Sequence, residues 1–70
     1  MRPTDQFGEQ LRRVRTERQL TQEQLAEASG LHRTEISLLE RGKRTPILDT
    51  IVAVANGLGV SPSELLQGVG

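Results

Sequence analysis

Two short helices joined by a tight turn are predicted between Leu20 and Gly42, and this stretch constrains the fold more than any other part of the sequence. Thr21 can accept a hydrogen bond from a free backbone N–H of the first turn, and Gln24, three residues later, can reach back to Thr21. Together they form a capping box. Gly30 has no Cβ, which suits the point where the first helix stops and the chain turns sharply. The second helix then runs to Gly42.

Apolar and small residues at fixed spacing indicate how these two helices enter and pack. Leu20 and Leu25 flank the capping box at the positions of a hydrophobic staple. Leu31 and Ile36 form a second such pair ahead of the second helix. Ala26 is small enough to let the two helices approach each other. The pattern predicts a helix-turn-helix, a motif whose second helix lies in a DNA major groove.

The spacing of this segment resembles the DNA-binding domain of phage repressors and Cro proteins, the XRE-like family. The residues that carry the resemblance are Gln22, Leu25, Ala26, Gly30, Ile36, Ser37, Glu40, Arg41 and Gly42. The likeness extends over roughly Phe7 to Leu66, and the family also includes small bacterial regulators and restriction–modification controllers. The resemblance implies an all-α fold, a compact five-helix bundle of the lambda-repressor-like kind.

Capping signals and apolar spacing in the rest of the chain agree with a five-helix bundle in one domain over residues 1–70. Ser61 and Glu64 form another capping box, which predicts the start of the last helix. We expect residues 1–4 to be a frayed arm with Arg2 solvated, the alternative being that Arg2 touches a DNA backbone. The expected helices span roughly residues 5–18, 22–29, 33–41, 47–57 and 62–67.

The composition excludes several classes of protein. Without cysteine, the chain has neither disulfides nor thiolate metal sites. The only histidine, His32, cannot build a metal site and is expected on the surface as a poor N-cap. No apolar run approaches the ~18 residues of a membrane span, so we expect a cytoplasmic protein without membrane contact. No nucleophile–base constellation is visible, so we expect no catalysis, cofactor or small-molecule ligand.

The charges balance overall but are unevenly placed. Nine basic and nine acidic residues give a net charge of zero, although nucleic-acid binders are often basic. Between residues 31 and 45 the bases Arg33, Arg41, Lys43 and Arg44 stand against only Glu35 and Glu40, whereas residues 46–70 contain no base. A locally positive face on a neutral body indicates modest non-specific DNA affinity and reliance on base contacts or dimerisation.

By match to the family, the base-facing positions of the second helix are Arg33, Thr34, Ser37 and Leu38. Arg33 is the strongest candidate, since a guanidinium can donate two hydrogen bonds to guanine O6 and N7. The alternative is that Arg33 grips a phosphate or stays solvated. Thr34 can bond a base edge or touch a thymine methyl. Leu38 can offer only an apolar contact, and it fits the core beside Leu39 equally well.

Phosphate contacts are expected from Gln22, Arg41, Lys43 and Arg44. Gln22 opens a helix, where the dipole and free N–H groups favour an anion, and its family counterpart bonds a DNA phosphate. The three bases match family positions that clamp the strand, the alternative being an ordinary charged loop. The resemblance also implies a structural ion pair between Arg15 and Glu40, with two independent solvated charges as the alternative.

The sequence therefore predicts a sequence-specific transcriptional regulator, with repression as the expected effect. One recognition helix covers too few base pairs for a specific address, so we expect a homodimer on a palindromic operator in double-stranded DNA. The apolar residues expected at the dimer interface are Leu58, Val60, Leu65, Leu66 and Val69. Two alternatives remain: an antitoxin or restriction–modification controller acting on its own operon, and a protein-interaction module on the same scaffold.

Overall fold

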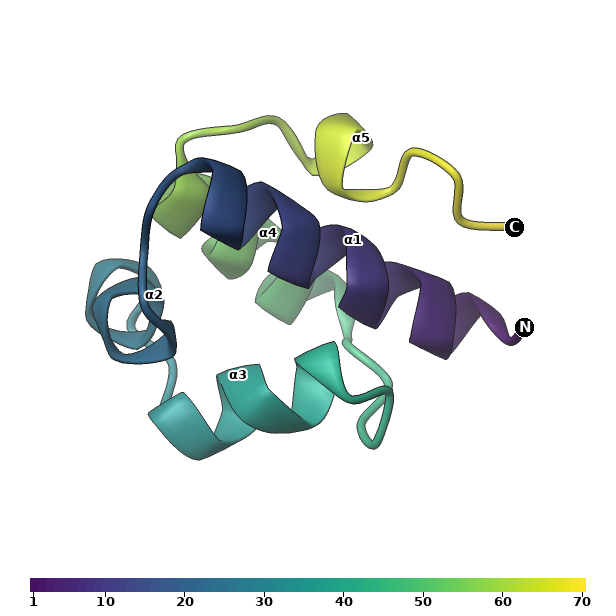
Figure 1. Cartoon of the computed structure of the whole chain (residues 1–70), viewed down its shortest axis with the longest axis horizontal. Coiled ribbons are helices and arrows are strands. Elements are labelled where there is room, and N and C mark those ends of the chain that lie inside the picture. The colour runs from purple at the N-terminus through teal and green to yellow at the C-terminus, as the bar shows by residue number, and fades with distance from the viewer.

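The computed structural model describes residues 1–70 and contains five helices and no strand (Figure 1). The helices are α1 (Pro3–Glu17), α2 (Gln22–Ser29), α3 (Arg33–Glu40), α4 (Leu48–Leu58) and α5 (Pro62–Leu65). Helix α2 packs against α3 and α4, while α1 packs against α3 and α5. In Figure 1, α3 runs along the lower edge of the molecule and both termini lie on the right. The predicted all-α five-helix fold is confirmed.

One apolar cluster holds the five helices together. Its members are Phe7, Leu11, Val14, Leu25, Ala26, Ile36, Leu39, Val54, Ala55, Leu58 and Leu65. Burying such side chains contributes about 25 cal/mol for each Å² of apolar surface removed from water. Helix α3 supplies only Ile36 and Leu39 to this cluster, so most of its surface is left facing away from the core.

Local capping explains where α2 and α5 begin and where α2 ends. The Thr21 hydroxyl accepts from the Gln24 backbone N–H at 3.0 Å, and the Thr21 backbone N–H donates to the Gln24 side chain at 2.8 Å. Ser61 and Glu64 make the same reciprocal pair at the start of α5. Gly30 adopts a left-handed conformation with φ of 79° after α2. These local predictions are confirmed.

The N-terminus differs from the expected frayed arm. Helix α1 begins at Pro3 instead of residue 5, because proline at the first helical position has no N–H to leave unpaired. Arg2 is not simply solvated, since its guanidinium donates to Asp5 at 3.0 Å and to the Gly42 carbonyl at 3.3 Å. The hydrogen bond from Arg2 lowers the pKa of the Asp5 carboxyl below its ordinary value. The first residues therefore tie α1 to the turn after α3.

Several other helix boundaries differ from the prediction by one or two residues, whereas both limits of α2 and the starts of α3 and α5 match it. Helix α4 begins at Leu48 because Ile47 occupies the N-cap position, where its side chain makes no capping bond. Helices α1, α3 and α5 end at Glu17, Glu40 and Leu65, one or two residues earlier than expected. None of the helices is both long and apolar enough to cross a lipid bilayer.

The predicted dimer interface is wrong for two of its five residues. Leu58 and Leu65 are buried in the core of the monomer, so they have no surface left for a partner. Val60 and Val69 pack against that core and are half-buried. Leu66 alone is exposed among the five. Apart from Met1, the other exposed large hydrophobic side chains are Ile47, Leu48 and Val52 on and before α4.

Candidate nucleic-acid interface

Helix α3 presents one continuous face away from the core. Residues three and four apart share a helix face, so the buried pair Ile36 and Leu39 leaves the four predicted base-facing residues on the other side. Arg33 and Thr34 are exposed, while Ser37 and Leu38 are half-buried. Leu38 does not join the buried cluster, because Leu39 occupies the core position beside it.

An imidazole fixes the residue at which this helix begins. His32 is the N-cap of α3, and its Nδ1 accepts a hydrogen bond from the Thr34 backbone N–H at 3.1 Å. An accepting Nδ1 requires the neutral ring with its proton on Nε2. His32 thus lies on the surface, as expected, but performs the capping role for which Ser, Thr or Asp is the usual residue. Arg33 becomes the first helical residue.

A glycine turn places the basic segment directly after α3. The backbone N–H of Lys43 donates to the Leu38 carbonyl at 2.9 Å, and that of Gly42 donates to the Leu39 carbonyl at 3.2 Å. This pairing closes the helix end around Gly42, whose φ is 69°. A Cβ on Gly42 would also collide with the Asp5 carboxylate. The basic side chains that lie exposed around this turn are Arg41, Lys43 and Arg44.

A shielded ion pair joins the end of α3 to α1. Arg15 Nε lies 2.5 Å from Glu40 Oε2, and Arg15 Nη2 donates to Glu40 Oε1 at 3.0 Å. The two side chains are only 11% and 4% exposed. A third donor of Arg15 bonds the Leu20 carbonyl at 2.7 Å. The hydrogen bonds to Glu40 raise the pKa of the Arg15 guanidinium, with desolvation opposing them.

Gln22 joins this pair from α2. Its Nε2 donates to Glu40 Oε1 at 3.1 Å, so side chains from α1, α2 and α3 meet at one carboxylate. A primary amide carries two N–H donors, and the second remains available to another acceptor. Every buried side-chain nitrogen and oxygen in the molecule has a hydrogen-bond partner. Gln22, one of the residues predicted to contact phosphate, is therefore held in one orientation at the start of α2.

Gly8 belongs to the same arrangement, although the sequence pattern did not predict it. It lies where α1 crosses the end of α3, and a Cβ there would lie 2.5 Å from the Leu39 carbonyl oxygen and 2.6 Å from that of Glu40. Only glycine permits the two backbones to come this close. The available signal was its place inside a helix, where glycine costs about 1 kcal/mol relative to alanine and needs a packing reason.

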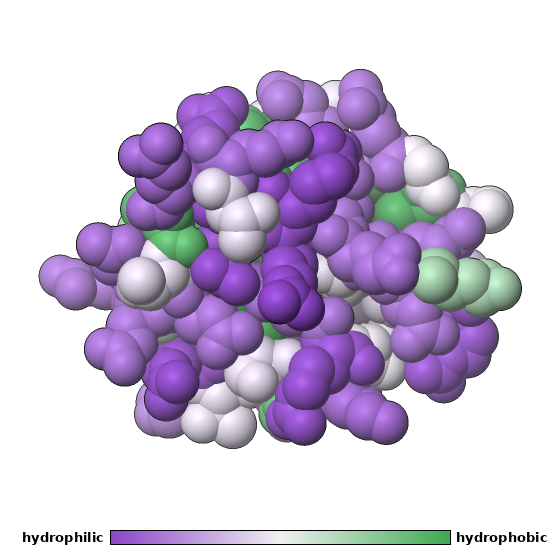
Figure 2. Space-filling view, viewed as in Figure 1, coloured by the Kyte–Doolittle hydropathy of each residue, from purple (hydrophilic) through white to green (hydrophobic).

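The charge exposed around α3 is more positive than the sequence count suggests. Of the two carboxylates between residues 31 and 45, Glu40 is enclosed and neutralised by Arg15, which leaves Glu35 against four exposed bases. Figure 2, which shows the molecule in the same orientation as Figure 1, is coloured mostly hydrophilic with small, separated hydrophobic areas.

Arg33 also has a neighbour on α2, since its Nε lies 3.7 Å from Glu23 Oε1.

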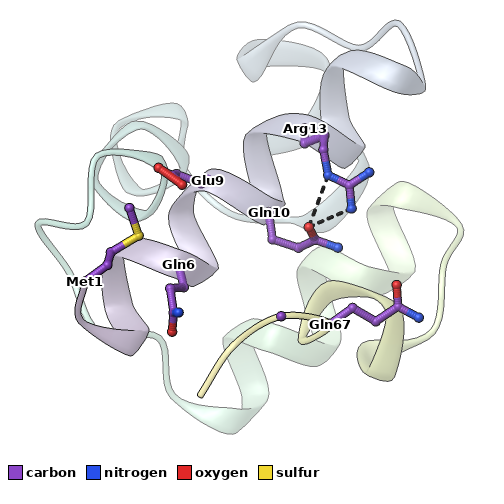
Figure 3. Close-up of a pocket in the computed structure, with 7 residues that line it drawn as sticks. Met1, Gln6, Glu9, Gln10, Arg13 and Gln67 are labelled. Carbon is purple, nitrogen blue, oxygen red and sulfur yellow. Dashed lines mark hydrogen bonds between the residues drawn. The ribbon is translucent and has the colours of Figure 1, made fainter.

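A polar hollow lies between α1 and the segment after α5 (Figure 3). Gln10 donates to the Glu64 carbonyl at 2.8 Å and accepts from Arg13 at 2.7 Å, and the backbone N–H of Gly70 donates to Gln6 at 3.0 Å. These bonds attach the C-terminal segment to α1. Helix α3 contributes no residue to this hollow, and no group of three potential metal-ligating side chains occurs anywhere in the structure.

The paired helices α2 and α3, the turn at Gly30 between them and the exposed bases at both ends of α3 define a helix-turn-helix DNA-binding domain. Comparison with known proteins agrees: the helix-turn-helix family model HTH_3 matches residues 11–65. The chain belongs to this family of DNA-binding transcriptional regulators.

Similar proteins include regulators of two kinds. The control protein C.BamHI of Bacillus amyloliquefaciens is 44% identical over 62 residues, which cover 87% of this chain and 76% of the relative. The immunity repressor protein of Bacillus phage phi105 is 41% identical over 59 residues, covering 84% of this chain and 41% of the repressor. The crystal structure of the restriction-modification controller protein C.AhdI from Aeromonas hydrophila superposes with a TM-score of 0.87 at 42% identity, over 89% of this chain and 94% of that one.

Proposed function

We propose that this chain binds a specific sequence of double-stranded DNA with α3 in the major groove and thereby regulates transcription from the adjoining promoter. One observation carries the proposal. The face of α3 that bears Arg33, Thr34, Ser37 and Leu38 lies opposite the buried Ile36 and Leu39. Because a major groove admits one α-helix, α3 can enter it without disturbing the core. The proposed role is binding and not catalysis, carried out in the cytoplasm.

Each residue on the groove-facing side has a role suited to its chemistry. Arg33, on the first turn of α3, reads a guanine through O6 and N7. Thr34 bonds a base edge or touches a thymine methyl, and Leu38 makes an apolar contact with such a methyl. Ser37 lies one turn after Arg33 and is the nearest additional donor. The partial exposure of Leu38 supports this role over a place in the core.

Residues on both sides of α3 contact the phosphates of the DNA backbone. At the start of α2, Gln22 offers its second amide N–H to a phosphate, where the helix dipole also favours an anion. Past the end of α3, the proposed phosphate contacts are Arg41, Lys43 and Arg44, all exposed on the glycine turn. Contacts at both ends would hold α3 at one depth and register in the groove.

We propose that the DNA-binding species is a homodimer formed through the start of α4. Ile47 and Leu48 are 66% and 72% exposed, and Val52, one turn after Leu48, is also exposed. An apolar hollow lined by Pro46, Ile51 and Leu66, among others, adjoins this surface. Exposed apolar patches of this kind mark interfaces. A second copy of the chain is the partner that would supply a second recognition helix and so a two-fold symmetric operator.

A controller protein of a restriction–modification operon is the second candidate function. The observation that favours it is the similarity to C.BamHI and C.AhdI, since the match extends over 76% and 94% of those chains but only 41% of the phi105 repressor. Such a controller would bind DNA upstream of its own gene. The residues proposed to contact DNA are the same under both functions.

Selection of duplexes from a random library tests the proposal. The account predicts enrichment of one sequence with two-fold symmetry and half-sites about 34 Å apart along the helix axis. Occurrence of that sequence upstream of the chain's own gene, beside genes for an endonuclease and a methyltransferase, would distinguish the controller from other regulators. A protein-interaction module on the same scaffold would enrich no sequence, and that result would overturn the proposal.

A further inference from the structure

Arg33, the proposed base-reading residue, has an internal partner on the neighbouring helix. Its Nε lies 3.7 Å from Glu23 Oε1, and the two side chains are 62% and 75% exposed. Glu23 belongs to the first turn of α2, where the helix dipole stabilises a negative charge. Both residues line an open depression whose other members are Arg15, Thr21 and Gln22.

The two arginines of this depression are held very differently. Arg15 is enclosed and uses its donors on Glu40 and on the Leu20 carbonyl. Arg33 makes no hydrogen bond to Glu23, because 3.7 Å exceeds the usual N–H···O range and water surrounds both groups. Exposed pairs of this kind are weak. Arg33 is therefore free to leave Glu23, but it leaves behind an unpaired carboxylate beside the DNA.

We propose that Glu23 is a specificity-determining residue that penalises non-cognate DNA by competing with phosphate oxygens for Arg33. This inference rests on the proposed function. A phosphate offers Arg33 only what Glu23 already offers, a negative charge, and the two anions repel each other. A guanine offers two directed acceptors on a neutral base. Arg33 can therefore bond to it without bringing a second anion close to Glu23. Glu23 thus lowers affinity for non-cognate DNA more than affinity for cognate DNA.

The test compares Glu23→Gln with Glu27→Gln on two duplexes. One duplex is the sequence that the wild-type chain enriches from a random library, and the other is a shuffled duplex of the same composition. Glu27 lies on the same helix, is exposed, and makes no ion pair, so its replacement controls for the change in net charge. We expect Glu23→Gln to raise affinity for the shuffled duplex about two- to fivefold, the strength of an exposed ion pair. Affinity for the enriched duplex should rise less, so that discrimination falls.

Two further results decide between this mechanism and a general charge effect. Glu27→Gln should raise both affinities alike and leave the ratio between the duplexes unchanged. In an Arg33→Ala background, Glu23→Gln should no longer alter that ratio, because the residue it competes for is gone. The inference is overturned if Glu23→Gln behaves like Glu27→Gln or if its effect on the ratio persists without Arg33. A wild-type chain that prefers neither duplex would instead overturn the proposed function.

Discussion

Helices α3 and α4 expose opposite kinds of side chain. The exposed side of α3 and the turn after it carry four bases, and the helix is fixed by a side-chain cap at His32 and by the Arg15–Glu40 pair. Helix α4 begins without a side-chain cap and exposes large aliphatic residues, and the chain from residue 46 onward contains no base. The α3 side is suited to binding a polyanion and the α4 side to packing against an apolar surface. The proposed DNA-binding homodimer requires both.

The contrast extends to what holds each side in place. The end of α3 depends on buried polar contacts and on the close approach of Gly8, where errors of an ångström matter. Helix α4 is held by apolar residues such as Val54, Ala55 and Leu58, which belong to the buried cluster. Substitutions at the α3 end should therefore affect both the stability of the monomer and DNA binding. Those on the exposed face of α4 should weaken assembly, and DNA binding through it, without changing the stability of the monomer.

The largest effect is expected from breaking the enclosed ion pair. Arg15→Met leaves Glu40 as a shielded carboxylate with only Gln22 as a donor, and should cost about 3–5 kcal/mol of unfolding free energy. Glu40→Leu should cost a similar amount by stranding Arg15. The double variant should lose less than the sum of the two, because neither charge is then left alone. Urea unfolding curves measure all three, and two small, additive losses would contradict the account.

The next largest effect tests the α4 surface. Leu48→Asn removes an apolar side chain from both copies at once, so dimerisation should weaken by about 3 kcal/mol if each buried leucine contributes about 1.5 kcal/mol. The unfolding free energy of the monomer should hardly change, since Leu48 is largely exposed. Ala28→Asn, at an exposed position of α2, is the matched control and should leave assembly unaltered. A wild-type chain that sediments as a monomer, both free and on a palindromic duplex, contradicts the dimer.

A smaller effect is expected from adding one methyl group at the crossing of α1 and α3. Gly8→Ala places a Cβ against two backbone carbonyls, which cannot move aside like a flexible side chain, and should cost about 1–3 kcal/mol. At an ordinary exposed helix position the same substitution would stabilise the protein by about 0.5–1 kcal/mol. The sign of the change in unfolding free energy therefore reports whether the two backbones are in contact.

Substitutions of base-contacting and phosphate-contacting residues on the α3 side should affect DNA affinity in different ways. Arg33→Ala should cost about 1–3 kcal/mol per half-site on the enriched duplex and relax the preference at one base pair. Lys43→Ala should weaken all duplexes alike and reduce the slope of log affinity against log salt by about one for each phosphate that the lysine no longer neutralises. Binding at several salt concentrations separates the two. Uniform losses from Arg33→Ala would make Arg33 a phosphate clamp.

Local signals in the sequence predicted the parts of the fold that depend on neighbouring residues. The capping boxes at Thr21 and Ser61 and the left-handed Gly30 each involve residues within a few positions of one another, so the limits of α2 match the prediction. The start of α1 was missed because Arg2 is an N-cap without a capping side chain, although Pro3 was a usable signal.

Features that depend on the packing of helices could not be read from spacing. The C-terminal apolar residues belong to short segments, and periodicity does not show which of Leu65 and Leu66 faces the core. The contacts of Gln22 with Glu40 and of Arg33 with Glu23 depend on how α2 and α3 cross. The resemblance to phage repressors led to the residues of the α3 face, because that family fixes positions on the recognition helix and not only its pattern.

Whether Arg33 reads a guanine in the major groove is decided by removing the atom that it would contact. Each guanine of the enriched duplex is replaced in turn by 7-deazaguanine, which lacks the N7 acceptor, and binding is measured for the wild type and for Arg33→Ala. We expect one guanine per half-site whose replacement weakens binding by the wild type, by about 1 kcal/mol or more, and leaves binding by Arg33→Ala unaffected. If no position is sensitive, or if both proteins lose affinity equally at the same position, Arg33 does not read that base.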